Sequence, residues 1–200
     1  MREAKNTLRA RLRGSRAAVP APLWAAADLA RTRALLGALS DLPSDAPVAA
    51  YASLPGEPST TAAIDALHRS GHPVLLPVLR RDIAWAWFEG WEHTAPAWRG
   101  IPQPTGTALG AEALGLASAI VAPCLAVGLD GTRLGTGGGW YDRALPHRQP
   151  SAVVIALARD AEVYPTLPVE AHDLRVDAVA TESGVTWFTT PPRAPRSEFA

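Results

Sequence analysis

The residues best suited to chemistry lie in one glycine-rich segment, residues 133–143, which reads Arg-Leu-Gly-Thr-Gly-Gly-Gly-Trp-Tyr-Asp-Arg. Consecutive glycines let the backbone take positive φ and let a bulky anion approach the main chain closely. Successive backbone N–H groups can then surround a phosphate, and a helix that opens at Trp140 or Tyr141 adds partial positive charge. The segment therefore predicts a binding site for a nucleotide phosphate.

Two charged side chains flank these glycines. Arg133 can donate bidentate hydrogen bonds to phosphate oxygens. Asp142 can hold a magnesium ion that bridges the same oxygens, because hard cations prefer carboxylate ligands. We therefore predict that Arg133 and Asp142 are the catalytic residues of this segment.

Two better-known phosphate motifs do not fit the segment. No Gly-Lys-Ser/Thr is present, which excludes a Walker loop, and Trp140 stands where the third glycine of Gly-x-Gly-x-x-Gly would be, counting from Gly135. The alternative is an irregular surface loop in a chain with 16 glycines. Arg133 before the glycines and Tyr-Asp-Arg after them favour phosphate binding.

A basic N-terminal arm is the second candidate for phosphate binding. Lys5 and Arg9 lie one helical turn apart, hence on one face of a helix predicted at residues 3–16. Such an arm suits phosphates on a nucleotide or on a nucleic acid, and the alternative is a solvated helix face. The formal net charge of zero weighs against nucleic acid and anionic membranes as partners.

The composition bounds the class of protein. Hydrophobic residues make up 48% of the chain, enough for a sizeable core. The single cysteine, Cys124, excludes an internal disulfide and a cysteine-cluster metal site, and we expect it to be a small buried residue. No secretory signal and no apolar run of about 18–20 residues is present, so a soluble cytoplasmic protein is predicted.

Apolar periodicity predicts helices at residues 3–16, 22–39 and 60–69 and strands at 48–51, 74–79, 83–88, 119–122, 152–157, 177–180 and 185–188. The nearly continuous apolar run at 74–79 is typical of a strand buried on both faces, and the strand–helix–strand order before it implies a parallel sheet. We expect 83–88 to be peripheral and 90–110 to be a loop. In the helix at 22–39, Leu29, Leu36 and Leu39 form the predicted inward stripe.

This order predicts an α/β sandwich in which helices pack on a mostly parallel sheet. Residues 1–190 are expected to form one domain and residues 191–200 a loose tail. Asp177 is interpreted as structural, paired with Arg175 or another cation. His172 is interpreted as a local hydrogen-bonding residue rather than an acid–base group. Core or loop packing is expected for the tryptophans at 85, 87, 91 and 98.

The glycine-rich segment resembles the signature of the 5-formyltetrahydrofolate cyclo-ligase (methenyltetrahydrofolate synthetase) family. Three further stretches agree in order and spacing with that family: Lys5-Asn-Thr-Leu-Arg9, Tyr51-Ala-Ser-Leu-Pro-Gly-Glu57, and His172-Asp173 with the segment at 176–182. The glycine-rich motif is specific, whereas the other three are weak alone and persuasive only in their order. Together they span residues 5–182.

The resemblance implies a three-layer α/β sandwich similar to the sugar-phosphate isomerase and CoA-transferase group. It also implies ATP- and Mg²⁺-dependent conversion of 5-formyltetrahydrofolate, with or without a polyglutamate tail, to 5,10-methenyltetrahydrofolate. The formyl oxygen would first attack the γ-phosphate, and N10 would then close the ring. No nucleic acid or membrane partner is implied, and a monomer or small homo-oligomer is expected.

Site residues follow from the same resemblance. ATP would contact Lys5, Arg9, Arg133, Leu134, Gly135, Thr136, Gly137, Gly138, Gly139, Trp140 and Tyr141. Magnesium would be held by Asp142 and Asp173, and the folate would meet Ala52, Glu57, Gly138 and Trp140. Two departures affect the folate side: Trp140 replaces the family's usual tyrosine, and Ala52 its usual leucine. The alternative function is a relative that binds nucleotide or folate without turnover.

Overall fold

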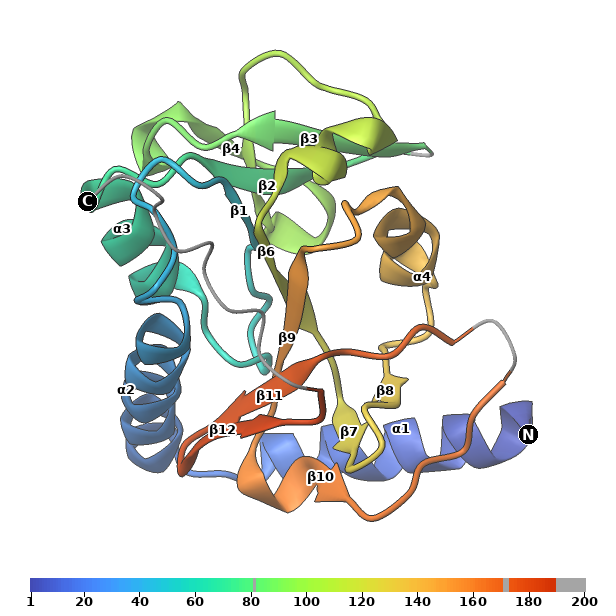
Figure 1. Ribbon diagram of the computed structural model, residues 1–200. Coiled ribbons are helices and arrows are strands. Elements are labelled where there is room, and N and C mark those ends of the chain that lie inside the picture. Colours follow the sequence, from blue (N-terminus) through green and yellow to red (C-terminus); the bar gives the residue numbers. More distant parts are fainter. Residues whose placement is uncertain (81, 171–172, 190–200) are drawn as a thin grey trace.

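The computed structural model describes residues 1–80, 82–170 and 173–189, and its centre is a sheet of seven strands (Figure 1). In spatial order these are β12 (Gly184–Trp187), β11 (Ala178–Thr181), β9 (Val153–Leu157), β6 (Ala119–Pro123), β1 (Val48–Ala49), β2 (Val74–Leu79) and β3 (Ile83–Trp87). The five inner strands are parallel, whereas β3 and β12 run antiparallel at the two edges. The predicted α/β class with a mostly parallel sheet is confirmed.

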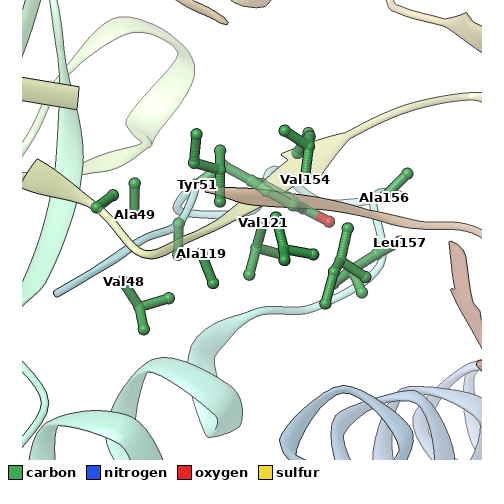
Figure 2. Packing of buried hydrophobic residues seen from close by; sticks show 14 of the residues in the cluster. Val48, Ala49, Tyr51, Ala119, Val121, Val154, Ala156 and Leu157 are labelled. Atoms are coloured by element: carbon green, nitrogen blue, oxygen red, sulfur yellow. The ribbon is translucent and has the colours of Figure 1, made fainter. Parts of the chain in front are cut away.

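The inner strands form where the sequence is continuously apolar. All five residues of β9 are buried, and β2 is buried from Val74 to Val78, as expected for parallel strands covered on both faces. Each such valine, leucine or isoleucine stabilises the fold by about 1.5–3 kcal/mol through burial. Figure 2 shows Val48, Val121 and Leu157 from three neighbouring strands on one side of the sheet, with Val154 on the other side.

Helices cover both faces of the sheet. Figure 1 shows α2 (Ala21–Ala38) and α3 (Thr61–Arg69) on one side of the sheet and α4 (Trp140–Ala144) on the other. The short helical turns are η1 (Trp91–His93), η2 (Trp98–Gly100), η3 (Ala111–Leu116), η4 (Leu145–His147) and η5 (Asp160–Glu162). The predicted helices at 22–39 and 60–69 are confirmed to within one residue at each end.

Of the inward stripe predicted for α2, Leu39 is buried and Leu36 packs against the core, but the inward orientation predicted for Leu29 is wrong. Leu29 is 52% exposed, and the buried face carries Arg31, Thr32 and Leu35. At 3.6 residues per turn, Leu29 lies about 120° around the helix from Leu35. Arg31 can face inward because its guanidinium donates to Glu182 at 2.8 Å and to Asp28 at 2.6 Å.

The helix α1 (Arg2–Ala17) lies along a second, three-stranded sheet (Figure 1). Its strands are β10 (Val163–Tyr164), β7 (Ala126–Gly128) and β8 (Arg133–Leu134). Leu12 of α1 packs with Leu125, Leu134 and Leu167 in a small apolar cluster. Strand β8 is the first part of the glycine-rich segment, and α1 carries Lys5 and Arg9. This layer therefore positions both candidates for phosphate binding.

The loop predicted at residues 90–110 and the partner predicted for Asp177 both need correction. The region at 90–110 is not only a loop, because β4 (Thr94–Pro96) and β5 (Pro102–Pro104) pair antiparallel there. Asp177 is structural, yet its carboxylate accepts a hydrogen bond from the Val154 amide at 2.8 Å, and Arg175 pairs with Asp130 instead.

The remaining expectations concern single side chains and the chain's ends. Cys124 is buried, and Trp85 is fully buried, whereas Trp98 is 64% exposed. No helix in the described part of the chain is long and apolar enough to cross a membrane. His172 and the tail predicted at 191–200 lie outside the described residues.

Candidate functional site

A cavity of about 390 Å³ lies between the glycine-rich segment and the N-terminal half of α1. Its lining residues are Arg2, Lys5, Arg9, Pro123, Arg133, Leu134, Gly135, Thr136, Gly137, Gly138, Gly139, Trp140, Tyr141, Asp142, Glu170 and Asp173. Every residue predicted from the sequence for nucleotide or metal is among them. The fold therefore brings three distant parts of the chain, near residues 5, 138 and 173, to one site.

Glycine is required at two positions of the turn. Gly137 has φ +108° and Gly139 has φ +63°, values that side-chain-bearing residues rarely adopt. A Cβ on Gly138 would meet no atom within 4 Å, so the main chain is open to the cavity there. Because α4 has only five residues, its dipole adds little, and the surrounding charged side chains dominate the electrostatics.

Arginine side chains from α1 hold the carbonyl groups of the turn. The Arg9 Nε donates to the Gly135 carbonyl at 2.9 Å, and Arg13 Nη2 donates to the Thr136 carbonyl at 2.8 Å. These hydrogen bonds fix the path of the backbone through the glycines. The same helix, α1, thus holds the turn and supplies the basic side chains of the cavity wall.

Arg133 and Asp142 form a close ion pair at the entrance to the turn. The Arg133 Nη2 lies 2.5 Å from Asp142 Oδ1, with the arginine buried and the carboxylate side chain 25% exposed. Within the described residues, the buried Nε of Arg133 has no hydrogen-bond partner. A buried donor of this kind is well suited to an anionic ligand, since leaving it unbonded is costly.

Lys5 is held by two carboxylates on the opposite wall. Its Nζ donates to Glu170 at 2.8 Å and to Asp173 at 2.5 Å, and the side chain is only 5% exposed. Burial alone would lower the pKa of Lys5, but the hydrogen bonds to Asp173 and Glu170 outweigh it and raise that pKa above its ordinary value. Lys5 is therefore a fixed positive charge beside Asp173.

The two carboxylates proposed for metal face the same cavity but come from different walls. Asp142 belongs to α4, and Asp173 lies three positions after Glu170. Among the residues that the structure describes, no group of three His, Cys, Asp or Glu side chains could hold a metal by itself. Two carboxylates combined with phosphate oxygens match the ligands that Mg²⁺ prefers, so the residues present fit a nucleotide-bound magnesium ion.

Ala52 and Glu57 do not line this cavity. Ala52 is buried, and the Glu57 carboxylate accepts a hydrogen bond from the Leu54 amide at 2.9 Å. Burial raises the pKa of Glu57, partly offset by the Leu54 amide and the charges of Arg16 and Arg99. The pKa of Tyr141 is raised by burial, and further by the charge of Glu57, so the loop lies within electrostatic reach of the cavity wall.

An aromatic cluster lies between the glycine turn and strand β3. The Trp85 and Trp140 rings pack edge-on at 5.1 Å, and Tyr141 is 5.0 Å from Trp140. Three buried polar atoms of this cluster, Trp85 Nε1, Trp140 Nε1 and the Tyr141 hydroxyl, have no hydrogen-bond partner among the described residues. Such a concentration of unpaired groups marks the cluster as a candidate for ligand binding.

The profile of the 5-formyltetrahydrofolate cyclo-ligase family matches residues 1–182. The chain belongs to this family. It is 38% identical over 186 residues to a 5-formyltetrahydrofolate cyclo-ligase of Mycolicibacterium smegmatis, covering 89% of this chain and 93% of that protein. It is also 31% identical over 143 residues to the Escherichia coli K12 protein of the same name, covering 69% and 79%.

Solved structures agree with the fold. The 5,10-methenyltetrahydrofolate synthetase of Aquifex aeolicus superimposes with a TM-score of 0.76 at 23% identity, covering 98% of both chains. The Mycoplasma pneumoniae 5,10-methenyltetrahydrofolate synthetase gives a TM-score of 0.71 at 18% identity, covering 89% of this chain and 98% of that one. At these identities the two structures support the fold.

Sequence reasoning missed several residues around this cyclo-ligase-family site. Arg2 precedes Lys5 by three positions and so shares its helix face, a signal that could have been used. Glu170 precedes Asp173 by three positions, and its amide donates to the Asp173 carboxylate at 2.7 Å. No local pattern marked Trp85, whose contact with Trp140 joins elements 55 positions apart in the sequence.

Proposed function

We propose that this cyclo-ligase-family protein converts 5-formyltetrahydrofolate to 5,10-methenyltetrahydrofolate in an ATP- and Mg²⁺-dependent reaction that releases ADP and phosphate. The observation that carries the proposal is the single cavity in which the glycine turn meets Lys5, Arg9, Arg133 and Asp142. A cavity with this density of cations and open main chain suits a polyphosphate.

The nucleotide side of the site follows from the charges. Lys5 and Arg9 approach from α1 and would neutralise phosphate oxygens, while residues 133–141 would wrap the nucleotide. The unpaired Nε of Arg133 would donate to the transferring phosphate, where negative charge is concentrated.

Magnesium would be held by Asp142 and Asp173. When bound, it would neutralise charge on the phosphate oxygens and fix their orientation. Both carboxylates now pair with cations, Asp142 with Arg133 and Asp173 with Lys5. Binding of the metal nucleotide would therefore free these cations from the carboxylates, so that they can contact phosphate instead.

The reaction needs phosphoryl transfer because an amide oxygen is a very poor leaving group. The formyl oxygen of the folate attacks the γ-phosphorus, the bond to the β–γ bridging oxygen breaks, and ADP leaves. N10 then attacks the formyl carbon and loses its proton, the carbon–oxygen bond breaks, and phosphate departs as the five-membered ring closes. In the first step, Arg133 would stabilise the negative charge on the transferring phosphate because it is already in place beside it. This step needs no strong protein base.

The folate would lie beside the glycine turn, against Gly138 and Trp140, with its pterin end towards Ala52 and Glu57. The unpaired Nε1 atoms of Trp85 and Trp140 support this placement, since a pterin offers carbonyl and ring-nitrogen acceptors. Trp140 supplies a flat ring and an N–H where the family usually has a tyrosine hydroxyl. The small Ala52 would leave more room beside the pterin than the usual leucine.

Several broader features belong to the same proposal. Residues 1–190 would form one α/β domain of three layers, grouped with the sugar-phosphate isomerase and CoA-transferase folds. The setting would be cytoplasmic and the state a monomer or small homo-oligomer. The family match over residues 1–182 supports a single domain. The substrate is proposed with or without a polyglutamate tail.

The direct test is spectroscopic. Purified protein mixed with 5-formyltetrahydrofolate, ATP and Mg²⁺ should generate the methenyl absorbance, and omission of either ATP or Mg²⁺ should abolish it. Calorimetric titration with folate and with a non-hydrolysable ATP analogue accompanies the assay. Tight binding without product would replace the proposal with a non-catalytic binding protein.

A further inference from the structure

Arg16 is a buried arginine at the far end of the helix that carries Lys5 and Arg9. It lies eleven residues after Lys5, three helical turns further on the same face. Its side chain is 3% exposed, and the Glu162 carboxylate that faces it is 2% exposed. The cavity does not reach it, so its charge has no direct role in phosphate binding.

The guanidinium of Arg16 bonds to three separate segments through all of its nitrogens. Nε and Nη2 donate to the two oxygens of Glu162, each at 2.8 Å. Nη2 also donates to the Cys124 carbonyl at 2.8 Å, and Nη1 donates to the Gly56 carbonyl at 3.3 Å. Such a fork of donors is specific to arginine, because a lysine could not span these acceptors together.

The three acceptors connect the parts of the proposed site. Cys124 joins strand β6 to strand β7, and through β7 to the glycine turn. Glu162 ends the turn η5, where its carboxylate also accepts from the Arg159 amide at 3.0 Å. Gly56 adjoins Glu57 and has φ +83°, so its carbonyl direction depends on a conformation that only glycine adopts readily.

The charge of Arg16 also reaches the Glu57 carboxylate. Other titratable groups that act on this region are Arg99, Tyr51, Tyr141 and Cys124. Arg16 and Arg99 lower the pKa of Glu57 against the raising effect of burial. Arg16 thus favours an ionised Glu57 as well as bonding to the residue before it.

We propose that Arg16 is a positioning residue that ties the Gly56–Glu57 loop to the phosphate-binding helix α1 and so sets the folate side of the site. The inference rests on the proposed function, in which Glu57 faces the pterin. Two observations carry it: the bond from Nη1 to the Gly56 carbonyl, and the location of Arg16 on the same face of α1 as Lys5 and Arg9.

The competing explanation is that Arg16 only stabilises the fold through its ion pair with Glu162. Removing one partner of a buried ion pair leaves an uncompensated charge and is strongly destabilising. A substitution of Arg16 alone would therefore not distinguish a loss of stability from a loss of loop positioning. The paired variant Arg16→Gln/Glu162→Gln removes both charges together, keeps side chains of related size, and is expected to fold.

The experiment compares the unaltered protein, this double variant, Arg16→Lys, and the control Arg11→Gln, which alters an exposed arginine of the same helix. We expect the double variant to raise KM for 5-formyltetrahydrofolate about tenfold, with kcat and the KM for ATP within about threefold. Hydrogen exchange should rise in the peptide covering residues 51–60 while the central strands stay protected. Arg11→Gln should behave as the unaltered protein.

The pH profile gives a readout that a purely structural role would not move. Without the Arg16 charge, the pKa of Glu57 rises, so the acid limb of kcat/KM for the folate should shift to higher pH. Arg16→Lys keeps the positive charge but loses the several donors of the guanidinium. The acid limb of its pH profile should therefore stay at the same pH, while KM for the folate still rises.

Three outcomes separate the two proposals. If the unaltered protein forms no methenyl product, the proposed function fails, and the exchange data alone decide whether Arg16 holds the loop. If it is active but Glu57→Gln leaves KM for the folate unchanged, the role of Glu57 fails. If Glu57→Gln weakens folate binding while the double variant keeps a normal KM and normal loop protection, the inference about Arg16 is wrong.

Discussion

At the scale of single residues, Arg133 and Asp142 share one short contact although their proposed ligands differ. Their 2.5 Å ion pair offsets the cost of burying the arginine, and it must be exchanged for phosphate and metal when the nucleotide binds. Each side chain is thus placed by the other before any ligand arrives. This preorganisation makes both residues sensitive targets for substitution.

We predict that Arg133→Ala and Asp142→Ala each lower kcat at least about 100-fold, because removal of one preorganised charge partner typically costs about 10²–10³ in rate. Circular dichroism should show an unchanged fold. The control is Arg11→Ala, an exposed arginine of α1 that does not line the cavity, for which kcat should stay within about threefold. Normal rates in both test variants would remove the assigned catalytic site.

Lys5 is expected to act on ATP rather than on the folate. Lys5→Ala removes a buried cation from the cavity wall and leaves negative charge from Glu170 and Asp173 there. We predict a rise of about tenfold in KM for ATP, with KM for 5-formyltetrahydrofolate within twofold, both from steady-state kinetics. A variant that weakened only folate binding would show that the N-terminal assignment is wrong.

At the scale of elements, the glycine turn depends on two kinds of feature. Its backbone conformations can be predicted from the sequence, whereas the contacts that hold it cannot. The turn and the opening of α4 at Trp140 were predicted correctly because glycine runs and a following helix are local signals. The hydrogen bonds from Arg9 and Arg13 to the turn carbonyls were not predicted, since they join residues more than 120 positions apart.

Two neighbouring glycines should respond differently to alanine. Gly137 has φ +108°, a conformation that residues with a side chain rarely adopt, so Gly137→Ala should destabilise the protein by about 1–2 kcal/mol. Gly138 has open space around its Cβ position, so Gly138→Ala should leave stability unchanged and affect only ligand binding. Urea unfolding of both variants measures the difference, and equal midpoints would contradict the assigned turn conformation.

The error in α2 shows why helix orientation is hard to predict. The leucine periodicity favoured an inward Leu29, but Arg31 is turned inward by Glu182, a residue 151 positions away. A sequence pattern scores arginine as polar and cannot include the carboxylate that would compensate its burial. The hairpin of β4 and β5 was missed for a related reason: each strand is three residues long and contains proline.

At the scale of the whole molecule, the site joins parts of the chain that the sequence keeps far apart. The parallel sheet was predictable because each strand is a local apolar run, and the motifs identified the residues that the fold brings together around one cavity. The aromatic cluster and the Arg16 contacts were not, because they depend on how the layers pack. Glu57 was predicted to face the pterin end of the folate, and that prediction stays untested; its side chain lies outside the lining of the cavity beside the glycine turn.

Because α1, the glycine turn and the segment near Asp173 meet only in the folded state, nucleotide binding should stabilise the entire protein. A ligand at 100 times its dissociation constant contributes about 2.7 kcal/mol by mass action. For a chain of 200 residues, this corresponds to a rise in melting temperature of about 5–10 °C. Differential scanning fluorimetry with a non-hydrolysable ATP analogue, with and without Mg²⁺, measures the shift.

In Asp142→Ala the increment due to Mg²⁺ should disappear while part of the nucleotide effect remains through Lys5 and Arg9. A full Mg²⁺ increment in that variant would place the metal elsewhere, and no shift in the unaltered protein would mean that this cavity does not bind the nucleotide.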